Sequence, residues 1–314
     1  MEMSMRTNLV SVFGVILFFI TGARAGTETV LWNFNPQQGD AGYPGDNTLI
    51  ADGSGNFYGA TVVNGANGSG AFFELSPNGS GGWNESVLHS FGPIDGTADG
   101  YYPFGHIARD KEGNFYGTTT SGGANGTGTV YEISRNSGGG WTATVIYNFA
   151  AFNSGDAAFP VSGPSMNDRG SLYGTTEHGG GSANCENGCG TVYELSPTSG
   201  GGWTETVLHS FSGKPDGSNP QSGLILDKAG YLYGTAFKGG AHSDGTAYMM
   251  RHAKNGWVFK VLYAFHPSKG GNPGYGALIM DKAGNLYGTA SSGGVHNTGA
   301  VWELAYSASR RITQ

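Results

Sequence analysis

Four aspartates recur at one place in the sequence, each of them four residues before a proline. They are Asp40, Asp99, Asp156 and Asp216, and the fifth position of the series holds Lys269. A ring of carboxylates with one ammonium group could bind a cation or accept hydrogen bonds from sugar hydroxyls. The same pattern arises when each aspartate caps a turn that leads into a strand fixed by proline. The spacing is compatible with both interpretations.

A second recurrent set of polar residues consists of amides and imidazoles. Its members are Asn67, Asn125, His242 and His296. Asparagine and histidine offer donors and acceptors to a polar ligand, and asparagine also suits left-handed turns. The two histidines lack a third ligand in the sequence, so we do not expect them to hold a metal ion.

Two stretches with possible chemistry break the repetition. Glu177 and His178 could act as acid and base, but no partner is identifiable, so no catalytic residue is assigned. The run DGTADG begins like a calcium loop at Asp95 and Asp99, but its twelfth position is His106 where such loops have glutamate. We expect no cofactor, with calcium at this loop as the alternative.

The chain has only two cysteines, Cys185 and Cys189, both inside an insertion in the third repeat. In an oxidising compartment two such residues are expected to form a disulfide. A metal site is the other interpretation, but it would need further ligands that the sequence does not show nearby.

The elements that must position these residues recur five times. A Tyr-Gly motif follows an apolar residue at Tyr58, Tyr116, Tyr173, Tyr233 and Tyr287, at spacings of 54–60 residues. A period of this length indicates a repeat architecture. Each unit contains short apolar runs bounded by Gly, Asn, Asp and Ser, which predicts strands a, b, c and d in chain order.

The predicted strands place the two sets of polar residues in loops. Strand a is predicted over residues 47–52, 106–110, 164–167, 223–227 and 277–281. The aspartate series lies in the d–a loops, and the amide and imidazole set lies in the b–c loops. In each unit the glycine after the tyrosine is expected to let neighbouring sheets approach closely.

The order of strands at the two ends of the chain predicts a closed ring. Residues 28–34 resemble a strand d and come first, whereas the last unit ends after strand c at residue 304. Pairing these two segments would remove both open sheet edges. We therefore predict an all-β, five-bladed β-propeller with four antiparallel strands per blade, in which the N-terminal strand completes the last blade and Val30 lies near Val301.

Composition restricts the possible partners and the location. Lys plus Arg number 16 against 23 Asp plus Glu, a net charge of −7, so nucleic acid is not an expected partner. Residues 1–25 resemble a secretory signal, with Arg6, an apolar run and Ala23-Arg24-Ala25. That run is shorter than the ~20 residues of a spanning helix. We expect a monomer that is secreted, periplasmic or at the cell surface, without membrane insertion after cleavage, with one domain over residues 26–306 and a tail over 307–314.

The repeated unit, DKAGNLYGT at residues 281–289 followed by Gly-Gly and a run such as GTVYELS, resembles the GloVer tandem repeat. The resemblance covers residues 28–304. The unit is also distantly similar to the NHL propeller repeat, which supports the propeller and its strand order. The GloVer resemblance implies no particular activity, so no catalytic residue is transferred.

Together these features predict an exported, non-catalytic propeller that binds a glycan or another extracellular or envelope polymer through its loop face. Several similar shallow sites would give avidity without strong single contacts. One alternative is a polysaccharide hydrolase or lyase that uses Glu177, His178 and an aspartate of a d–a loop. Another is a structural envelope protein with an envelope protein as its partner.

Overall fold

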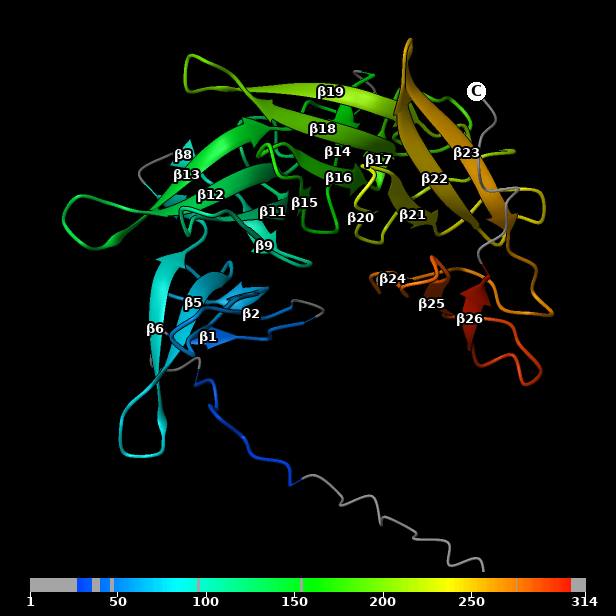
Figure 1. Cartoon of the computed structure of the whole chain (residues 1–314). Helices are drawn as coiled ribbons and strands as arrows, with labels where there is room; N and C mark the ends of the chain where they lie inside the picture. The colour runs from blue at the N-terminus through cyan, green and yellow to red at the C-terminus, as the bar shows by residue number, and fades with distance from the viewer. Residues whose placement is uncertain are drawn as a thin grey trace, which may run out of the picture. The chain divides into compact units, whose positions relative to one another are not determined.

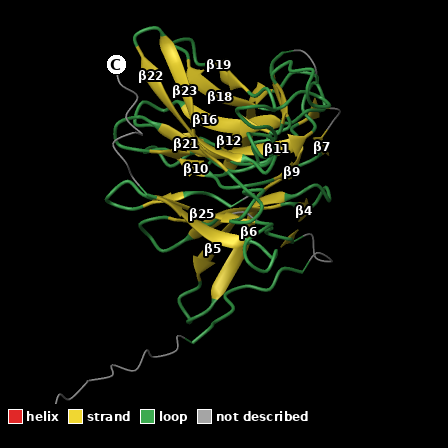
Figure 2. Cartoon of the chain, turned by 90° about the vertical axis from the view of Figure 1, so that its right-hand side faces the viewer, coloured by secondary structure: helices red, strands yellow, loops and turns green. Residues whose placement is uncertain are grey.

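The computed structural model describes residues 27–35, 40–45, 48–94, 97–152, 155–274 and 276–305. The regular elements in these ranges are all strands, and no helix occurs among them (Figure 2). The chain divides into two units, Met1–Leu31 and Trp32–Gln314, and the second holds every strand. The predicted signal segment and the tail over residues 307–314 lie outside the described residues.

The second unit forms a five-bladed β-propeller arrangement, with one antiparallel sheet per repeat (Figure 1). Blade 1 consists of β2 (Ile50–Ala51), β3 (Phe57–Thr61), β5 (Ala71–Pro77) and β6 (Trp83–Ser90). Blade 2 consists of β10 (Ala108–Arg109), β11 (Phe115–Ser121), β12 (Thr129–Arg135) and β13 (Trp141–Asn148), and β9 (Tyr101–Pro103) pairs with β11.

The later blades repeat this order. Blade 3 consists of β15 (Ser165–Met166), β16 (Leu172–Thr176), β18 (Thr191–Pro197) and β19 (Trp203–Ser210). Blade 4 consists of β20 (Ile225–Leu226), β21 (Leu232–Ala236), β22 (Thr246–Ala253) and β23 (Gly256–Ala264). Blade 5 consists of β24 (Ile279–Met280), β25 (Leu286–Ala290) and β26 (Ala300–Leu304).

Short ribbons outside the blades pair loop segments. They are β1 (Ala41–Gly42) with β4 (Val63–Asn64), β7 (Pro93–Ile94) with β8 (Thr97–Ala98), and β14 (Ala157–Ala158) with β17 (His178–Gly179). Two of these ribbons join a d–a loop to the b–c loop of the same blade. The two loop sets therefore lie on one face of the propeller, called here the loop face.

The a strands are shorter than predicted, because each is only two residues long. In blade 3 the prediction included Pro164, which cannot donate a ladder hydrogen bond. In blade 2 it included His106, whose imidazole is directed to the carbonyl oxygen of Pro164. Residues between each d–a loop and its a strand therefore line the centre of the propeller and do not form ladder hydrogen bonds.

Each Tyr-Gly glycine lies opposite an aromatic side chain of strand c. The cross-strand pairs are Gly59–Phe73, Gly117–Tyr131, Gly174–Tyr193, Gly234–Tyr248 and Gly288–Trp302. A Cβ atom at any of these glycines would overlap the facing ring. The prediction that the glycine serves contact between sheets was therefore wrong: the close approach is between neighbouring strands of one blade.

The tyrosine of the motif connects three strands of its blade through its hydroxyl group. In blade 2, Tyr116 lies 3.0 Å from Asp110 of the a–b turn and 3.2 Å from Glu132 of strand c. Blades 1 and 5 contain the same triad, with Tyr58 and Tyr287. In blade 4 the glutamate position holds Met249, and Tyr233 still donates to Asp227 at 3.2 Å.

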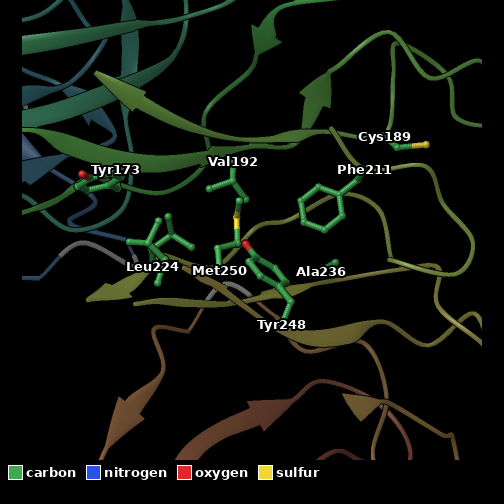
Figure 3. Packing of buried hydrophobic residues seen from close by; sticks show 9 residues of the cluster. Tyr173, Cys189, Val192, Phe211, Leu224, Ala236, Tyr248 and Met250 are labelled. Atoms are coloured by element: carbon green, nitrogen blue, oxygen red, sulfur yellow. The ribbon is translucent and has the colours of Figure 1, made fainter. Parts of the chain in front are cut away.

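The hydrophobic core lies between successive blades. Between blades 3 and 4 it contains Val192, Phe211, Leu224, Tyr248 and Met250, all buried, and Figure 3 shows these side chains gathered between the two sheets. Apolar residues on both faces of a strand are expected where a sheet is covered on both sides. This packing fixes the positions of the loops above it.

The predicted fourth strand of blade 5 is not observed among the described residues. Strand β26 pairs with β25 alone, and residues 27–35 contain no strand. Val30 and Val301 are 63% and 82% exposed. Closure of the ring by the N-terminal segment therefore stays a prediction.

Candidate functional site

The d–a aspartates accept hydrogen bonds from aromatic or imidazole groups of the preceding strand. The distances are 3.4 Å from Trp32 Nε1 to Asp40, 3.2 Å from the Tyr147 hydroxyl to Asp156, and 2.9 Å between His209 Nε2 and Asp216. His89 Nε2 contacts Asp99 in the same way. The partner is always two residues before the phenylalanine that ends this segment, a spacing that is visible in the sequence.

Backbone amides occupy the other oxygen atoms of these carboxylates. Ala41 N donates to Oδ1 of Asp40 at 3.2 Å, and Ala157 N donates to Oδ1 of Asp156 at 2.8 Å. Gly92 N donates to Asp99 at 3.0 Å, and Ser212 N donates to Asp216 at 3.1 Å. Hydrogen bonds that favour the carboxylate, including those from His209 and Ser212, outweigh burial and lower the pKa of Asp216 below its ordinary value. This geometry supports the turn-capping interpretation, and ligand binding by these residues stays a prediction.

Two glutamates of d strands form carboxyl pairs with aspartates of this series. Burial first, and then the hydrogen-bonded carboxylate of Asp156, raise the pKa of Glu205 to about 8. Burial and the carboxylate of Asp40 likewise raise the pKa of Glu85 to about 8. A neutral glutamic acid beside a carboxylate can donate the hydrogen bond that joins them.

The carboxyl pairs occur only where the neighbouring aromatic group is Trp32 or Tyr147. Where that group is His209, the equivalent d-strand residue of the next blade is Phe259, whose ring stacks on the imidazole at 3.7 Å with an interplanar angle of 8°. Next to His89 the equivalent residue is Ala143. Each aspartate of the d–a loops therefore lies beside either a glutamic acid or a histidine, the glutamic acid in two junctions between blades and the histidine in the other two.

Replacing Glu205 by glutamine is expected to stabilise the protein at alkaline pH. The pKa of Glu205 rises from 4.5 to about 8 on folding, so the stability it contributes is full below pH 4.5 and is lost as pH rises toward 8. Glutamine mimics the protonated acid. Thermal unfolding should therefore show equal melting temperatures for Glu205→Gln and wild type at pH 4 and a higher one for the variant at pH 9.

The exposed turn residue Glu112 provides the control for this experiment. Glu112→Gln should leave the difference between pH 4 and pH 9 unchanged. A Glu205→Gln variant that is no more stable than wild type at pH 9 would rule out the neutral acid at this junction.

The asparagines and histidines predicted in the b–c loops mainly contact other groups of the protein. Asn67 Nδ2 donates to Ser90 O at 3.0 Å, and Asn125 Nδ2 donates to Phe149 O at 2.8 Å. The rings of His242 and His266 are in edge contact at 4.8 Å, and His296 is exposed. Ligand binding by this set stays a prediction.

In the described part of the chain no group of three or more His, Cys, Asp or Glu residues is placed to hold a metal ion. Asp95 of the predicted calcium loop lies outside the described residues. Asp99 is engaged by His89 and by the amide of Gly92. Calcium at this loop therefore stays an untested alternative to the expectation of no cofactor.

Glu177 and His178, the weak catalytic candidates, face different neighbours. Glu177 accepts a hydrogen bond from Gln221 Nε2 at 3.0 Å. The imidazole of His178 lies against the rings of Phe152 and Phe159, at 5.6 and 5.5 Å, and its buried Nδ1 has no hydrogen-bond partner among the described residues. Adjacent residues of an extended segment project to opposite sides. The two groups are therefore not brought together as an acid and a base.

The predicted disulfide between Cys185 and Cys189 is confirmed, and the alternative of a thiolate metal site is thereby wrong. Cys189 is fully buried in the core between blades 3 and 4, beside Phe211 (Figure 3). The disulfide therefore ties the insertion over residues 181–189 to the core.

A central cavity of about 600 Å³ is lined by residues from all five blades. Its side chains come from Thr48, Phe104, His106, Val161, Ser162, Ala277, Thr289, Ala290 and Ser291, and glycines complete the wall. None of these lining residues carries a carboxylate or an ammonium group. The cavity is of the size that small-molecule sites in proteins have.

His106 reaches from blade 2 across the centre of the propeller. Its ring lies where a Cβ atom at Gly223 of blade 4 would be, and its backbone lies against Gly163 of blade 3. Burial lowers the pKa of His106 to about 4, although a hydrogen bond to the carbonyl of Pro164 raises it in part. The imidazole is therefore neutral near pH 7, with one donor and one acceptor nitrogen.

The importance of His106 was missed at the level of the sequence. In the five repeats, the residue four positions before the a–b turn residue is Thr48, His106, Gly163, Gly223 or Ala277. His106 is the one large side chain at a repeat position that otherwise holds small residues, and this difference is visible in the sequence. In the sequence His106 otherwise stands out only as the twelfth position counted from Asp95, where a calcium loop has glutamate.

A family model described as the Gloeobacter/Verrucomicrobia repeat matches residues 10–201 and 182–314. No curated protein matches the sequence. The two matches cover the N-terminal and C-terminal repeats in turn, and they agree with the resemblance found from the repeated motif.

Solved structures that match this chain share little sequence with it. The extracellular domain of a hybrid two-component system from B. thetaiotaomicron is 12% identical with a TM-score of 0.50, over 85% of this chain and 28% of that one. A gluconolactonase from Xanthomonas campestris is 13% identical with a TM-score of 0.48, over 82% of this chain and 70% of that one. The chain spans 28% of the length of the first protein, and that likeness shows the fold alone.

Proposed function

The chain belongs to the Gloeobacter/Verrucomicrobia repeat family, and from that premise we propose that it is an exported, non-catalytic propeller that binds a neutral glycan segment. The binding site is the central cavity, entered from the loop face. The observation that carries the proposal is the wall of that cavity, which combines the Phe104 ring and the neutral imidazole of His106 with hydroxyl groups. The polymer would be extracellular or part of the envelope.

The chemistry of the wall suits a sugar ring better than an ion. A pyranose presents an apolar face and a rim of hydroxyl groups, so it needs an aromatic surface beside donors and acceptors. Phe104 supplies the first and the Thr48 hydroxyl lines the cavity as the second. The Ser291 hydroxyl donates to Asn272 O and the Ser162 hydroxyl pairs with Thr175, so these two offer the sugar acceptor oxygens. Because no lining residue is charged, neither a cation nor an anion would gain a counter-charge there.

Replacing Phe104 by alanine is expected to weaken binding of a neutral glycan about tenfold, since an aromatic contact contributes about 0.5–1.5 kcal/mol beyond area burial. His106→Ala should weaken it further by removing the acceptor nitrogen of the neutral imidazole, whose N–H is directed to the carbonyl of Pro164. The measurement is a neutral-polysaccharide array followed by calorimetry with the best oligosaccharide. Circular dichroism checks that each variant is folded.

Lys282→Ala, in the a–b turn of blade 5 at the other end of the blades, is the matched control and should bind like wild type. If neither cavity variant changes the affinity, the glycan binds elsewhere and the proposed site is wrong. Release of reducing ends from a bound polymer would instead favour the hydrolase. Failure to bind any neutral glycan would contradict the proposal and favour a structural role.

Export is the second part of the proposal. The disulfide supports it, because disulfides persist in oxidising compartments. The described residues include no helix long and apolar enough to span a membrane. Fractionation of cells that produce the full chain, with N-terminal sequencing of the mature protein, tests export and cleavage near residue 25.

We also propose that residues 28–34 form the fourth strand of blade 5. In blades 1 to 4 the last strand pairs with strand c, whereas the outer edge of β26 has no partner among the described strands. A cavity of about 290 Å³ beside this edge is lined by Tyr263, Phe265, Lys269 and Trp302. Its position corresponds to the place that a d strand takes in the complete blades, so an added strand would fill it.

A further inference from the structure

The insertion that carries the disulfide forms one wall of a second cavity on the loop face. This cavity has a volume of about 520 Å³ and lies between the insertion, the d–a loop that leads into blade 4 and the b–c loop of blade 4. Its lining includes Cys185, Lys214, Ser218, Lys238 and Ser243. Only the third repeat has the insertion, so this cavity is a feature that the other repeats do not reproduce.

The lining is cationic although the protein as a whole is acidic. Lys214 and Lys238 both line the cavity, and no Asp or Glu does. The ion pairs of His89 with Asp99 and of His209 with Asp216 involve neither lysine, and neither lysine pairs with a carboxylate among the described residues. The carboxylate in the same d–a loop, that of Asp216, is directed at His209 and Ser212.

Hydrogen bonds hold the walls of this cavity in place before any ligand binds. Asn184 Nδ2 donates to Ser212 O at 2.9 Å, which joins the insertion to the d–a loop. Two backbone hydrogen bonds, at 2.8 and 3.0 Å, join Ser218 to Lys238. Because Cys189 is fixed in the core, the insertion cannot move away freely. A preformed site loses less entropy when a ligand binds.

We propose that this cavity binds an anionic substituent of the polymer, either the carboxylate of a uronic acid or a sulfate ester. The two ammonium groups would form charge-assisted hydrogen bonds with the anion, and the serine hydroxyls would donate to its remaining oxygens. The biological part of this inference rests on the proposed glycan function. The site itself depends only on the lysines and the loops that hold them.

The test uses small probes that do not depend on the central cavity. Sodium glucuronate and sodium sulfate are titrated into the full mature protein and followed by NMR, with glucose as the neutral counterpart of glucuronate. We expect saturable binding of at least one anion that weakens as sodium chloride is added. Lys214→Gln and Lys238→Gln should each weaken this binding about tenfold, as expected for loss of one charge-assisted contact.

Lys228→Gln, in the a–b turn of blade 4, removes the same charge far from this cavity along the blade and should leave anion binding unchanged. Phe104→Ala should also leave it unchanged, which separates this site from the proposed neutral site. The inference is overturned if neither anion saturates, if glucose binds as tightly as glucuronate while sulfate does not bind, or if the double lysine variant binds the anion like wild type.

Discussion

Removing residues 27–35 is expected to lower the free energy of unfolding by at least about 4 kcal/mol, the scale of losing a large aromatic side chain from a core. Phe34 packs edge-on against Phe73 at 5.2 Å, and Trp32 donates to the buried carboxylate of Asp40. Both residues also pack on the core of blade 1. The truncation would remove these contacts together with the proposed fourth strand of blade 5. Chemical denaturation of the mature protein measures the loss.

Two further variants separate the two contributions. Removing residues 27–31 alone keeps Trp32 and Phe34, so any large loss of stability must come from the closing strand. Removing residues 307–314 shortens the chain at its other end and should change the stability by less than about 0.5 kcal/mol, as surface changes do. If the two short truncations have the same effect, the N-terminal segment does not complete the last blade.

Gly174→Ala is expected to destabilise the protein by about 3 kcal/mol, at the upper end of the cost of overpacking a core. The new methyl group would overlap the ring of Tyr193, which is fully buried and cannot rotate away. The same substitution at Gly200, in the turn between β18 and β19, meets no atom within 4 Å. Gly200→Ala is therefore the matched control in the same blade, and it should be close to neutral.

Thermal and chemical unfolding of the two variants measure this difference. A Gly174→Ala protein as stable as Gly200→Ala would mean that the aromatic ring can move, and the account of the Tyr-Gly motif would be wrong. Because five glycines share this arrangement, Gly117→Ala and Gly234→Ala should repeat the result in blades 2 and 4.

The repeat made the fold accessible from the sequence. The tyrosine period gave the number of blades, and the short apolar runs predicted four strands per unit, which blades 1 to 4 show and of which blade 5 shows three among the described residues. The a strands were overestimated because apolar residues at their start, such as Ile107 and Leu224, look like strand residues although they are buried outside the ladder. The disulfide was also predictable, since only two cysteines are present.

The candidate sites were less accessible, because they depend on which blades face one another. The d–a aspartates recur as a ligand ring would, and the hydrogen bonds they accept also suit a capped turn at each junction, as Asp216 with Ser212 shows. His106 acquires its role only because Gly163 and Gly223 of later blades leave room for it. Lys214 and Lys238 come from different loops and line one cavity only in three dimensions.

Closure of the ring is the central claim, because it makes the five repeats one closed propeller around the central cavity. In complete blades the residue opposite the strand c glutamate is Ser86, Thr144 or Thr206, and the equivalent pair in blade 5 is Thr29 with Glu303. The direct test is therefore a Thr29→Cys/Glu303→Cys variant, in which the native cysteines cannot interfere because none is free. Neighbouring cysteines of paired antiparallel strands are close enough to cross-link.

We predict that mild oxidation cross-links this variant within one chain, seen as a fast-migrating monomer on a non-reducing gel, and raises its melting temperature. The pair Thr29→Cys/Val301→Cys, which is out of register, should cross-link much less. Absence of a cross-link, or cross-linking only between two chains, would contradict closure of the propeller by its own N-terminal strand.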